Sequence, residues 1–335
     1  MVVFKGPVAV LGEVGRIIFF AERLMMGQTG VTRKMITADI SLFFVAVFWG
    51  SNFVIMKEAL EVIAPFTYLG LRFLVATLFL APLFWKRVAR ASSQDLAAGC
   101  LIGFFLFAGF SFQTVGLLYT TPAKSGFITG IAVVIVPFLY YLVTKRFPGW
   151  AAFVGGGLAA CGLYLLTVGD TFSLGFGDML TLISAFLFAS HIIAIALHAP
   201  RRDPLVLAVI QIAFTGLAST VMALFFESTA GMFIHPPLIW GAILYAVLFC
   251  TIGAFVTQTT AQRFTPPAHV ALILSLEAVF AGIFSYFFWG ELFTVRKLSG
   301  AMLILLGIII AELSSVIAAK SAARQAAMFS AVPPD

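Results

Sequence analysis

Four side chains that can bind or carry charge lie inside otherwise apolar stretches of this 335-residue chain. They are the amide of Asn52, the guanidinium of Arg72, the imidazole of His191 and the carboxyl of Glu277. Asn52, within the stretch "AVFWGSNFV", is the only asparagine in the sequence. A polar group in apolar surroundings is costly unless it has a partner or faces water. These residues are therefore candidates for binding a polar ligand or relaying protons.

The elements that must position them are predicted to be membrane-spanning helices. The chain is 61% apolar and 10% charged, with a mean hydropathy of +1.08. Soluble domains carry charge on about a quarter of their residues. Apolar runs of about 20 residues recur, long enough to cross a hydrocarbon core of roughly 30 Å. Because these runs are continuous and do not alternate, we predict an all-α polytopic membrane protein and not a β-barrel.

Ten transmembrane helices are predicted, with short loops that leave no room for a soluble domain. Their ranges are 39–57, 66–85, 97–118, 123–143, 149–168, 178–197, 205–226, 238–260, 267–289 and 298–317. Residues 1–38 are predicted to form a cytoplasmic or interfacial segment, or to reflect an over-extended gene start. Residues 318–335 are predicted to form a disordered cytoplasmic tail.

The orientation is predicted from the basic residues. Most of them fall on the side where the first helix starts: Arg33, Lys34, Lys86, Arg87, Arg90, Lys145, Arg146, Arg201, Arg202, Arg263, Lys320 and Arg324. Positive charge favours the cytoplasmic side, so both termini are expected there. Because the basic residues are scattered singly or in pairs, the net charge of +6 indicates topology and not nucleic-acid binding.

The chain repeats itself in two units, 39–168 and 178–317. The aligned pairs include Asn52 with His191 and Arg72 with Gln211 at a shift of 139 residues, and Gln113 with Gln258 and Gly155 with Gly300 at a shift of 145. Each unit holds five helices, and five is an odd number, so the second unit enters the membrane upside down. This is the inverted-repeat design of secondary transporters, whose substrate site lies near the midplane between the repeats.

The repeat places Asn52 and His191 at equivalent depths. Each lies about 18 Å into its helix at 1.5 Å per residue, close to the midplane. Trp49, Asn52, Phe53 and Met56 follow helical spacing and share one face. We expect Trp49, Asn52 and His191 to flank one central space and bind substrate. The alternatives are that Asn52 only bonds a neighbouring helix and that His191 is a satisfied buried histidine.

Arg72 and Glu277 are the charged candidates. Arg72 lies about 10 Å from the nearer surface, where it either snorkels outward, attracts a substrate carboxylate or pairs with Glu277. Gln211 keeps the polar character at the equivalent position without the charge. Glu277 lies roughly 15 Å deep, where an unpaired carboxylate favours its protonated form. Glu277 and His191 are therefore the predicted proton carriers.

Three stretches carry a family resemblance: "FWGSNFV" (48–54), "AKSGFITG" (123–130) and "SLEAVFAGIFSYFFWGE" (275–291). With them, the chain resembles the drug/metabolite transporter superfamily, in its EamA-type ten-helix branch, over residues 39–317. The resemblance implies a bacterial inner-membrane carrier, and many such carriers export amino acids and other small metabolites. One departure is Ala278, which stands where the pattern usually has proline, so a weaker bend is expected there.

The sequence favours a secondary active transporter, with efflux of amino acids or related compounds and proton coupling as hypotheses. A passive facilitator and a membrane-embedded lipid-modifying enzyme remain alternatives. The sequence contains no GxxxxGK[ST], HExxH or GxSxG pattern, so neither ATP hydrolysis nor an enzyme is predicted. Three dispersed cysteines argue against disulfides and metal. The expected partners are a small metabolite and membrane lipids, with no cofactor and no nucleic acid, in a monomer or homodimer.

Overall fold

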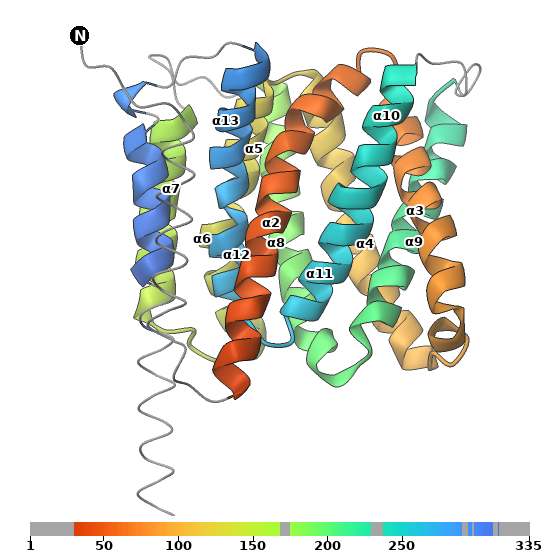
Figure 1. The fold of residues 1–335 in the computed structure, drawn as a ribbon, viewed down its shortest axis with the longest axis horizontal. Coiled ribbons are helices and arrows are strands. Elements are labelled where there is room, and N and C mark those ends of the chain that lie inside the picture. Colours follow the sequence, from red (N-terminus) through yellow and green to blue (C-terminus); the bar gives the residue numbers. More distant parts are fainter. Residues whose placement is uncertain are drawn as a thin grey trace, which may run out of the picture.

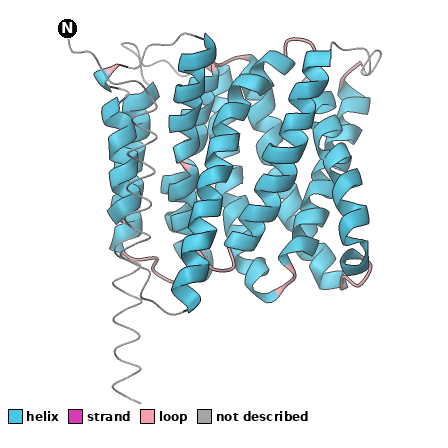
Figure 2. Ribbon diagram, in the orientation of Figure 1, coloured by secondary structure: helices cyan, strands magenta, loops and turns pink. Residues whose placement is uncertain are grey.

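The computed structural model describes residues 30–167, 175–228, 237–289, 294–296, 298–310 and 314. Every regular element in this part of the chain is a helix, and short loops join the helices (Figures 1 and 2). Eight helices are long and apolar enough to cross a membrane, and two shorter apolar helices cover Trp150–Leu165 and Leu298–Ile310. The prediction of an all-α polytopic membrane protein is confirmed. The predicted tail, and residues 1–29 of the predicted N-terminal segment, lie outside the described residues.

The first repeat consists of α2 to α7. Their bounds are α2 Gly30–Ala59, α3 Pro65–Val88, α4 Ser93–Leu118, α5 Pro122–Gly130, α6 Ala132–Thr144 and α7 Trp150–Thr167. The helix starts follow from local chemistry. Pro65 and Pro122 occupy the first helical positions, where a missing N–H costs nothing. Ser92 and Asp95 form a capping box at the start of α4.

The second repeat begins at α8. Its elements are α8 Phe176–His198, η1 Ala199–Arg201, α9 Pro204–Phe226, α10 Pro237–Tyr245, the π-helical segment η2 Ala246–Gly253, α11 Ala254–Ala261, α12 Pro267–Leu274, α13 Leu276–Trp289 and the helix Leu298–Ile310. The span predicted as 238–260 is therefore one rod with a π-helical middle. Such segments free backbone carbonyls and occur often at functional sites.

The two repeats are inverted relative to each other. Figure 1 shows α2 and α8, the equivalent first helices, running in opposite directions through the bundle. The most extensive helix contacts cross between the repeats: α3 packs on α9, α4 on α8, and α2 on α13. Each repeat therefore folds around helices of the other, and the space at their centre is shared.

The predicted glycine positions form a symmetric contact between the repeats. A Cβ atom added to Gly155 of α7 would lie 2.8 Å from the Gly307 backbone oxygen, and one added to Gly162 would meet the Gly300 oxygen. Gly155 and Gly162 are the repeat equivalents of Gly300 and Gly307. These small residues therefore bring α7 and the last described helix into backbone contact within one chain.

The fourth helix of each repeat is interrupted at an equivalent point. In the first repeat, α5 ends at Gly130 and α6 begins at Ala132; in the second, α12 ends at Leu274 and α13 begins at Leu276. Residue 130 is equivalent to 275. At Ser275 the Oγ donates to the Leu272 carbonyl (2.7 Å), and Ala278 N donates to the Ser275 carbonyl (3.3 Å) in a tight 3₁₀ pattern. The helix is therefore interrupted at Ser275 without a proline at residue 278, and the weaker bend expected from Ala278 stays a prediction.

Candidate functional site

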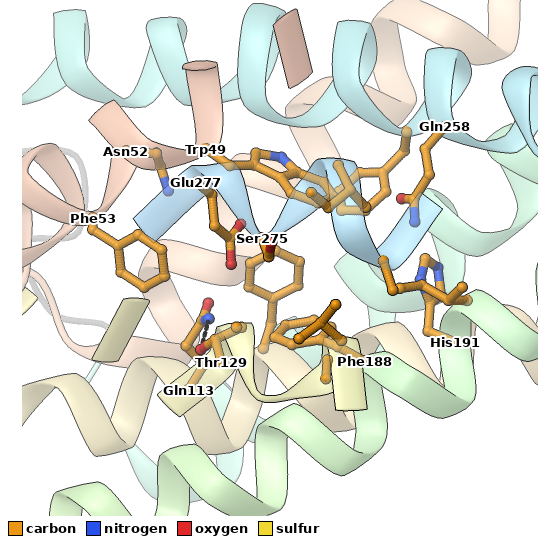
Figure 3. A pocket seen from close by; sticks show the side chains of 18 of the residues that line it. Trp49, Asn52, Phe53, Gln113, Thr129, Phe188, His191, Gln258, Ser275 and Glu277 are labelled. Carbon is orange, nitrogen blue, oxygen red and sulfur yellow. Dashed lines mark hydrogen bonds between the residues drawn. The ribbon is translucent and has the colours of Figure 1, made fainter. Parts of the chain in front are cut away.

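A cavity of about 70 Å³ lies between the two repeats, large enough for a few water molecules (Figure 3). Its walls come from α2, α3, α4, the α5–α6 and α12–α13 junctions, α8 and α11. Discontinuous helices that meet at the repeat interface are the usual framework of a substrate site in inverted-repeat membrane proteins. The cavity therefore lies between the two repeats, where the sequence predicted a substrate site.

The lining follows the repeat. Eight pairs of equivalent positions both face the cavity: Trp49 and Phe188, Asn52 and His191, Phe53 and Ile192, Phe110 and Phe255, Gln113 and Gln258, Thr129 and Leu274, Gly130 and Ser275, and Ala132 and Glu277. Both repeats therefore contribute apolar, largely aromatic side chains to the wall of the cavity. The polar groups of the cavity include both members of two pairs, Asn52 with His191 and Gln113 with Gln258, and Arg72 and Glu277, whose equivalents carry no charge. Arg72 and Glu277 are the only formally charged groups among its lining residues.

The predicted face of α2 lies on this cavity, since Trp49, Asn52, Phe53 and Met56 all line it. Trp49 is held in place by its indole Nε1, which donates to the Cys250 carbonyl at 3.0 Å. Asn52 is 5% exposed, and its Oδ1 has no hydrogen-bond partner. A buried amide oxygen without a partner is unusual. Asn52 therefore offers an acceptor to a ligand or to water in the cavity.

His191 lies at the end of the cavity opposite Asn52 (Figure 3). Its Nε2 shares a hydrogen bond of 2.7 Å with the Gln211 Oε1, and Gln211 Nε2 donates to the Thr259 Oγ1 at 2.9 Å. The ring also meets Phe255 edge to face, with centroids 6.0 Å apart. Gln211 itself does not line the cavity. Its contact is with His191, so it positions the imidazole, and a direct substrate contact is not seen.

Arg72 is fully buried, so it does not snorkel to the surface. Its Nε donates to the Thr251 Oγ1 at 2.7 Å and its Nη2 to the Cys250 carbonyl at 2.9 Å. Both acceptors belong to the π-helical segment η2, and π-helical turns occur often at functional sites. The guanidinium also lies over the rings of Phe73 and Phe110, at 5.2 and 5.0 Å.

The Nη1 of Arg72 is buried and has no hydrogen-bond partner among the described residues. Within the described part of the chain no carboxylate pairs with this guanidinium. The predicted pairing with Glu277 is therefore absent. A buried guanidinium that is oriented by two bonds and keeps one free donor suits the binding of a carboxylate.

Glu277 lies in the first turn of α13, directly after the break at Ser275. It is 7% exposed, and the described residues give its carboxyl neither a hydrogen bond nor an ion pair. Figure 3 shows the carboxyl directed into the cavity, at the same end as Asn52. A carboxylate in such surroundings is costly without a counter-charge. A proton or a ligand cation would supply that charge.

Several lining residues had not been singled out from the sequence. Phe188 is the repeat equivalent of Trp49, and Phe110 and Phe255 are equivalents at the shift of 145. Applying the shift of 139 to Trp49 of the predicted central face would have found Phe188, whereas Phe110 and Phe255 have no equivalent on that face. Gln113 donates from Nε2 to the Thr129 Oγ1 at 3.0 Å, whereas the Gln258 Oε1 is buried without a partner.

The described residues hold no group of three or more metal-ligating side chains. Cys100, Cys161 and Cys250 are free thiols. The polar chemistry of the cavity therefore comes from the groups already described: an amide, an imidazole, a guanidinium and a carboxyl. Their arrangement suits reversible binding of a small polar molecule.

Comparisons with known proteins match both repeats. The model of the EamA-like transporter family matches residues 36–168 and again residues 175–313. An uncharacterized transporter of Archaeoglobus fulgidus is 37% identical over 287 residues, 86% of this chain and 89% of that protein. The uncharacterized transporter YetK of Bacillus subtilis is 26% identical over 268 residues, 76% and 80% of the two chains. A crystal structure with 16% identity and a TM-score of 0.68, covering 83% of this chain and 96% of its own, shares the fold.

Proposed function

The chain belongs to the EamA-like transporter family and is a multi-pass membrane transporter, and on this premise we propose that it exports amino acids or related zwitterionic metabolites by proton-coupled alternating access. The single observation that carries the proposal is the cavity between the repeats, with a guanidinium and a carboxyl in its wall that the described residues leave without an ion pair. Inverted repeats can pack in two related ways, each opening a shared site to one side.

The substrate class is inferred from the two charges. A free amino acid carries a carboxylate and an ammonium group, which are the complements of Arg72 and Glu277. The Arg72 Nη1 is available to the carboxylate, and the Glu277 carboxyl to the ammonium. The aromatic walls, with Trp49, Phe110 and Phe255, provide apolar surface for a substrate side chain.

Transport is coupled to protons if the Glu277 carboxyl binds either a proton or the substrate ammonium group, but not both at once. Glu277 has no partner in the described structure, so a proton and a substrate ammonium compete for it. Competition at one site makes the two ligands cross the membrane in opposite directions, which is antiport. With protons entering down their gradient, substrate leaves the cell. His191 is the second proposed proton carrier, since its Nε2 is bonded to a neutral amide and not to a fixed charge.

The proposed location is the inner (plasma) membrane, with both termini in the cytoplasm. The support is the excess of basic residues at one end of the bundle, including Arg87, Arg201, Arg202 and Arg263. In this orientation the loop between α4 and α5 faces outward, and the loop between α11 and α12 faces inward. Residues 39–168 and 178–317 are proposed as the two functional repeats.

The experiment is a growth screen of a strain that overproduces the protein, against toxic concentrations of amino acids and of metabolites with one charge. Resistance to one class of zwitterion, lost in the Arg72→Gln and Glu277→Gln variants, supports the proposal. Resistance only to singly charged or neutral compounds, or to none of those tested, contradicts the proposed substrate class. Membrane levels of each variant, measured by immunoblot, control for expression.

A further inference from the structure

Two hydrogen bonds at opposite ends of the bundle are repeat equivalents of each other. Thr120 donates from Oγ1 to the Asp178 Oδ1 at 2.5 Å, and Thr265 donates from Oγ1 to the Asp39 Oδ1 at 3.0 Å. The shift of 145 places Thr120 on Thr265, and the shift of 139 places Asp39 on Asp178. The same contact is therefore made twice. In one the threonine belongs to the first repeat and the aspartate to the second, and in the other the roles of the repeats are exchanged.

Each bond joins the two repeats. Thr120 lies in the connection from α4 to α5 and binds the first turn of α8; Thr265 lies in the connection from α11 to α12 and binds α2. Both threonines stand two residues before a proline that begins the next helix, Pro122 or Pro267. Each contact thus bonds the loop that precedes an interrupted helix of one repeat to the first helix of the other repeat.

The two contacts lie on either side of the cavity. Asp39 stands thirteen residues before Asn52, and Asp178 thirteen residues before His191, which corresponds to about 20 Å along each helix. In Figure 1 the start of α8 lies at one end of the bundle and the start of α2 at the other. We refer to them as the Asp178 end and the Asp39 end. The two contacts therefore stand between the depth of the cavity and the two ends of the bundle.

The Asp178 end carries further close contacts. A Cβ atom on Gly116 of α4 would lie 2.9 Å from the Gly177 carbonyl of α8, so the two backbones touch beside the Thr120 contact. Lys124 of α5 also approaches Asp178, with Nζ 3.4 Å from Oδ2. The equivalent positions at the Asp39 end are Ala261 and Ala38, both buried. Equivalent pairs of helices, α4 with α8 and α11 with α2, therefore pack at the two ends of the bundle, with different small residues.

We propose that Thr120–Asp178 and Thr265–Asp39 are the two latches of the transport cycle, each closing one mouth of the cavity. Both latches are formed in this structure, as the proposal requires of an occluded state. Opening toward one side breaks the latch at that end while the other holds. The inference rests on the proposed alternating-access function, and it names the residues that alternate.

The test measures access to the cavity and needs no substrate. A single thiol is placed in the cavity wall by Ala132→Cys, in a chain whose three native cysteines are replaced by alanine. Sealed membrane vesicles of both orientations are treated with a membrane-impermeant maleimide, and the labelling rate from each face is recorded. Into this background are introduced Thr120→Val or Thr265→Val, which remove the hydroxyl and keep the shape. Thr120→Ser and Thr265→Ser, which keep the hydroxyl, are the matched controls.

We expect Thr120→Val to raise labelling about tenfold from the face at the Asp178 end only, and Thr265→Val from the opposite face only. The serine variants should label as the background does. The inference is overturned if the valine variants leave both rates unchanged, if both raise labelling from the same face, or if serine and valine act alike. The readout is access to the cavity and not transport. A protein that shows this labelling pattern but does not export amino acids would therefore refute the proposed function and still support the two latches.

Discussion

Arg72 and Glu277 line one cavity, yet no ion pair joins them. Each comes from a different repeat, and the equivalent positions hold Gln211 and Ala132, which carry no charge. The guanidinium is turned toward η2 by Thr251 and the Cys250 carbonyl, and the carboxyl is placed by the helix break at Ser275. Because the two groups of opposite charge are kept apart in a buried site, both are available to a ligand that carries the complementary charges.

This separation predicts how Arg72 variants discriminate between substrates. Arg72→Gln should raise the KM for a transported amino acid by about ten- to hundredfold, because a charge-assisted hydrogen bond to the carboxylate is lost. Transport of the corresponding amine, which lacks the carboxylate, should change little. Competition assays with the amino acid and the amine in vesicles measure both.

The matched control for this comparison is Thr251→Val. It removes one of the bonds that orient the guanidinium but keeps its charge, so the preference for the amino acid over the amine should persist. If Arg72→Gln and Thr251→Val weaken amino acid and amine equally, Arg72 serves only the structure of η2.

The chain of polar contacts behind His191 predicts a stability effect. Gln211→Leu leaves the His191 Nε2 buried without its partner, which should lower the free energy of unfolding by about 1–3 kcal/mol. Thr77→Ala, which removes only a hydroxyl bonded to its own helix, should cost far less. Reversible unfolding in detergent micelles compares the two variants. Equal losses would show that Gln211 has no special role beside the imidazole.

The contact between α7 and the last described helix makes a prediction with an internal control. Gly155→Ala places a methyl group 2.8 Å from the Gly307 carbonyl, so it should destabilise the protein by about 1–3 kcal/mol. Gly157→Ala, in the same helix, meets nothing within 4 Å and should be neutral or stabilising by up to about 1 kcal/mol. Thermal unfolding of purified protein ranks the pair; the opposite order would contradict the described packing.

The sequence was sufficient to predict the helical membrane fold, the repeat and the place of the cavity. Helical spans depend on apolar length, which is a local property, and the inverted repeat follows from their number. The equivalence of Asn52 and His191 then placed both at the centre, where the structure has both lining the cavity. These inferences needed only periodicity and depth along a helix.

Other features depend on contacts that no local pattern encodes. Arg72 is oriented by a carbonyl 178 positions away, in a π-helical segment that contains no proline. Ser275 interrupts its helix by side-chain and 3₁₀ bonds, although Ala278 lacks the proline typical of the pattern. Asp39 and Asp178 stand at the predicted starts of equivalent helices, but the threonines that bind them lie 226 and 58 positions away in the sequence.

The most direct test of the account is accumulation of an amino acid in proteoliposomes across an imposed pH gradient. The amino acid is one to which the growth screen shows resistance. Wild-type protein and Glu277→Asp, which keeps an acid in the cavity, are compared with Glu277→Gln, which does not. We predict accumulation above the equilibrium level on the more acidic side for the first two, and equilibration only for Glu277→Gln. Accumulation by Glu277→Gln equal to that of the wild type, or no accumulation by the wild type, would contradict the account.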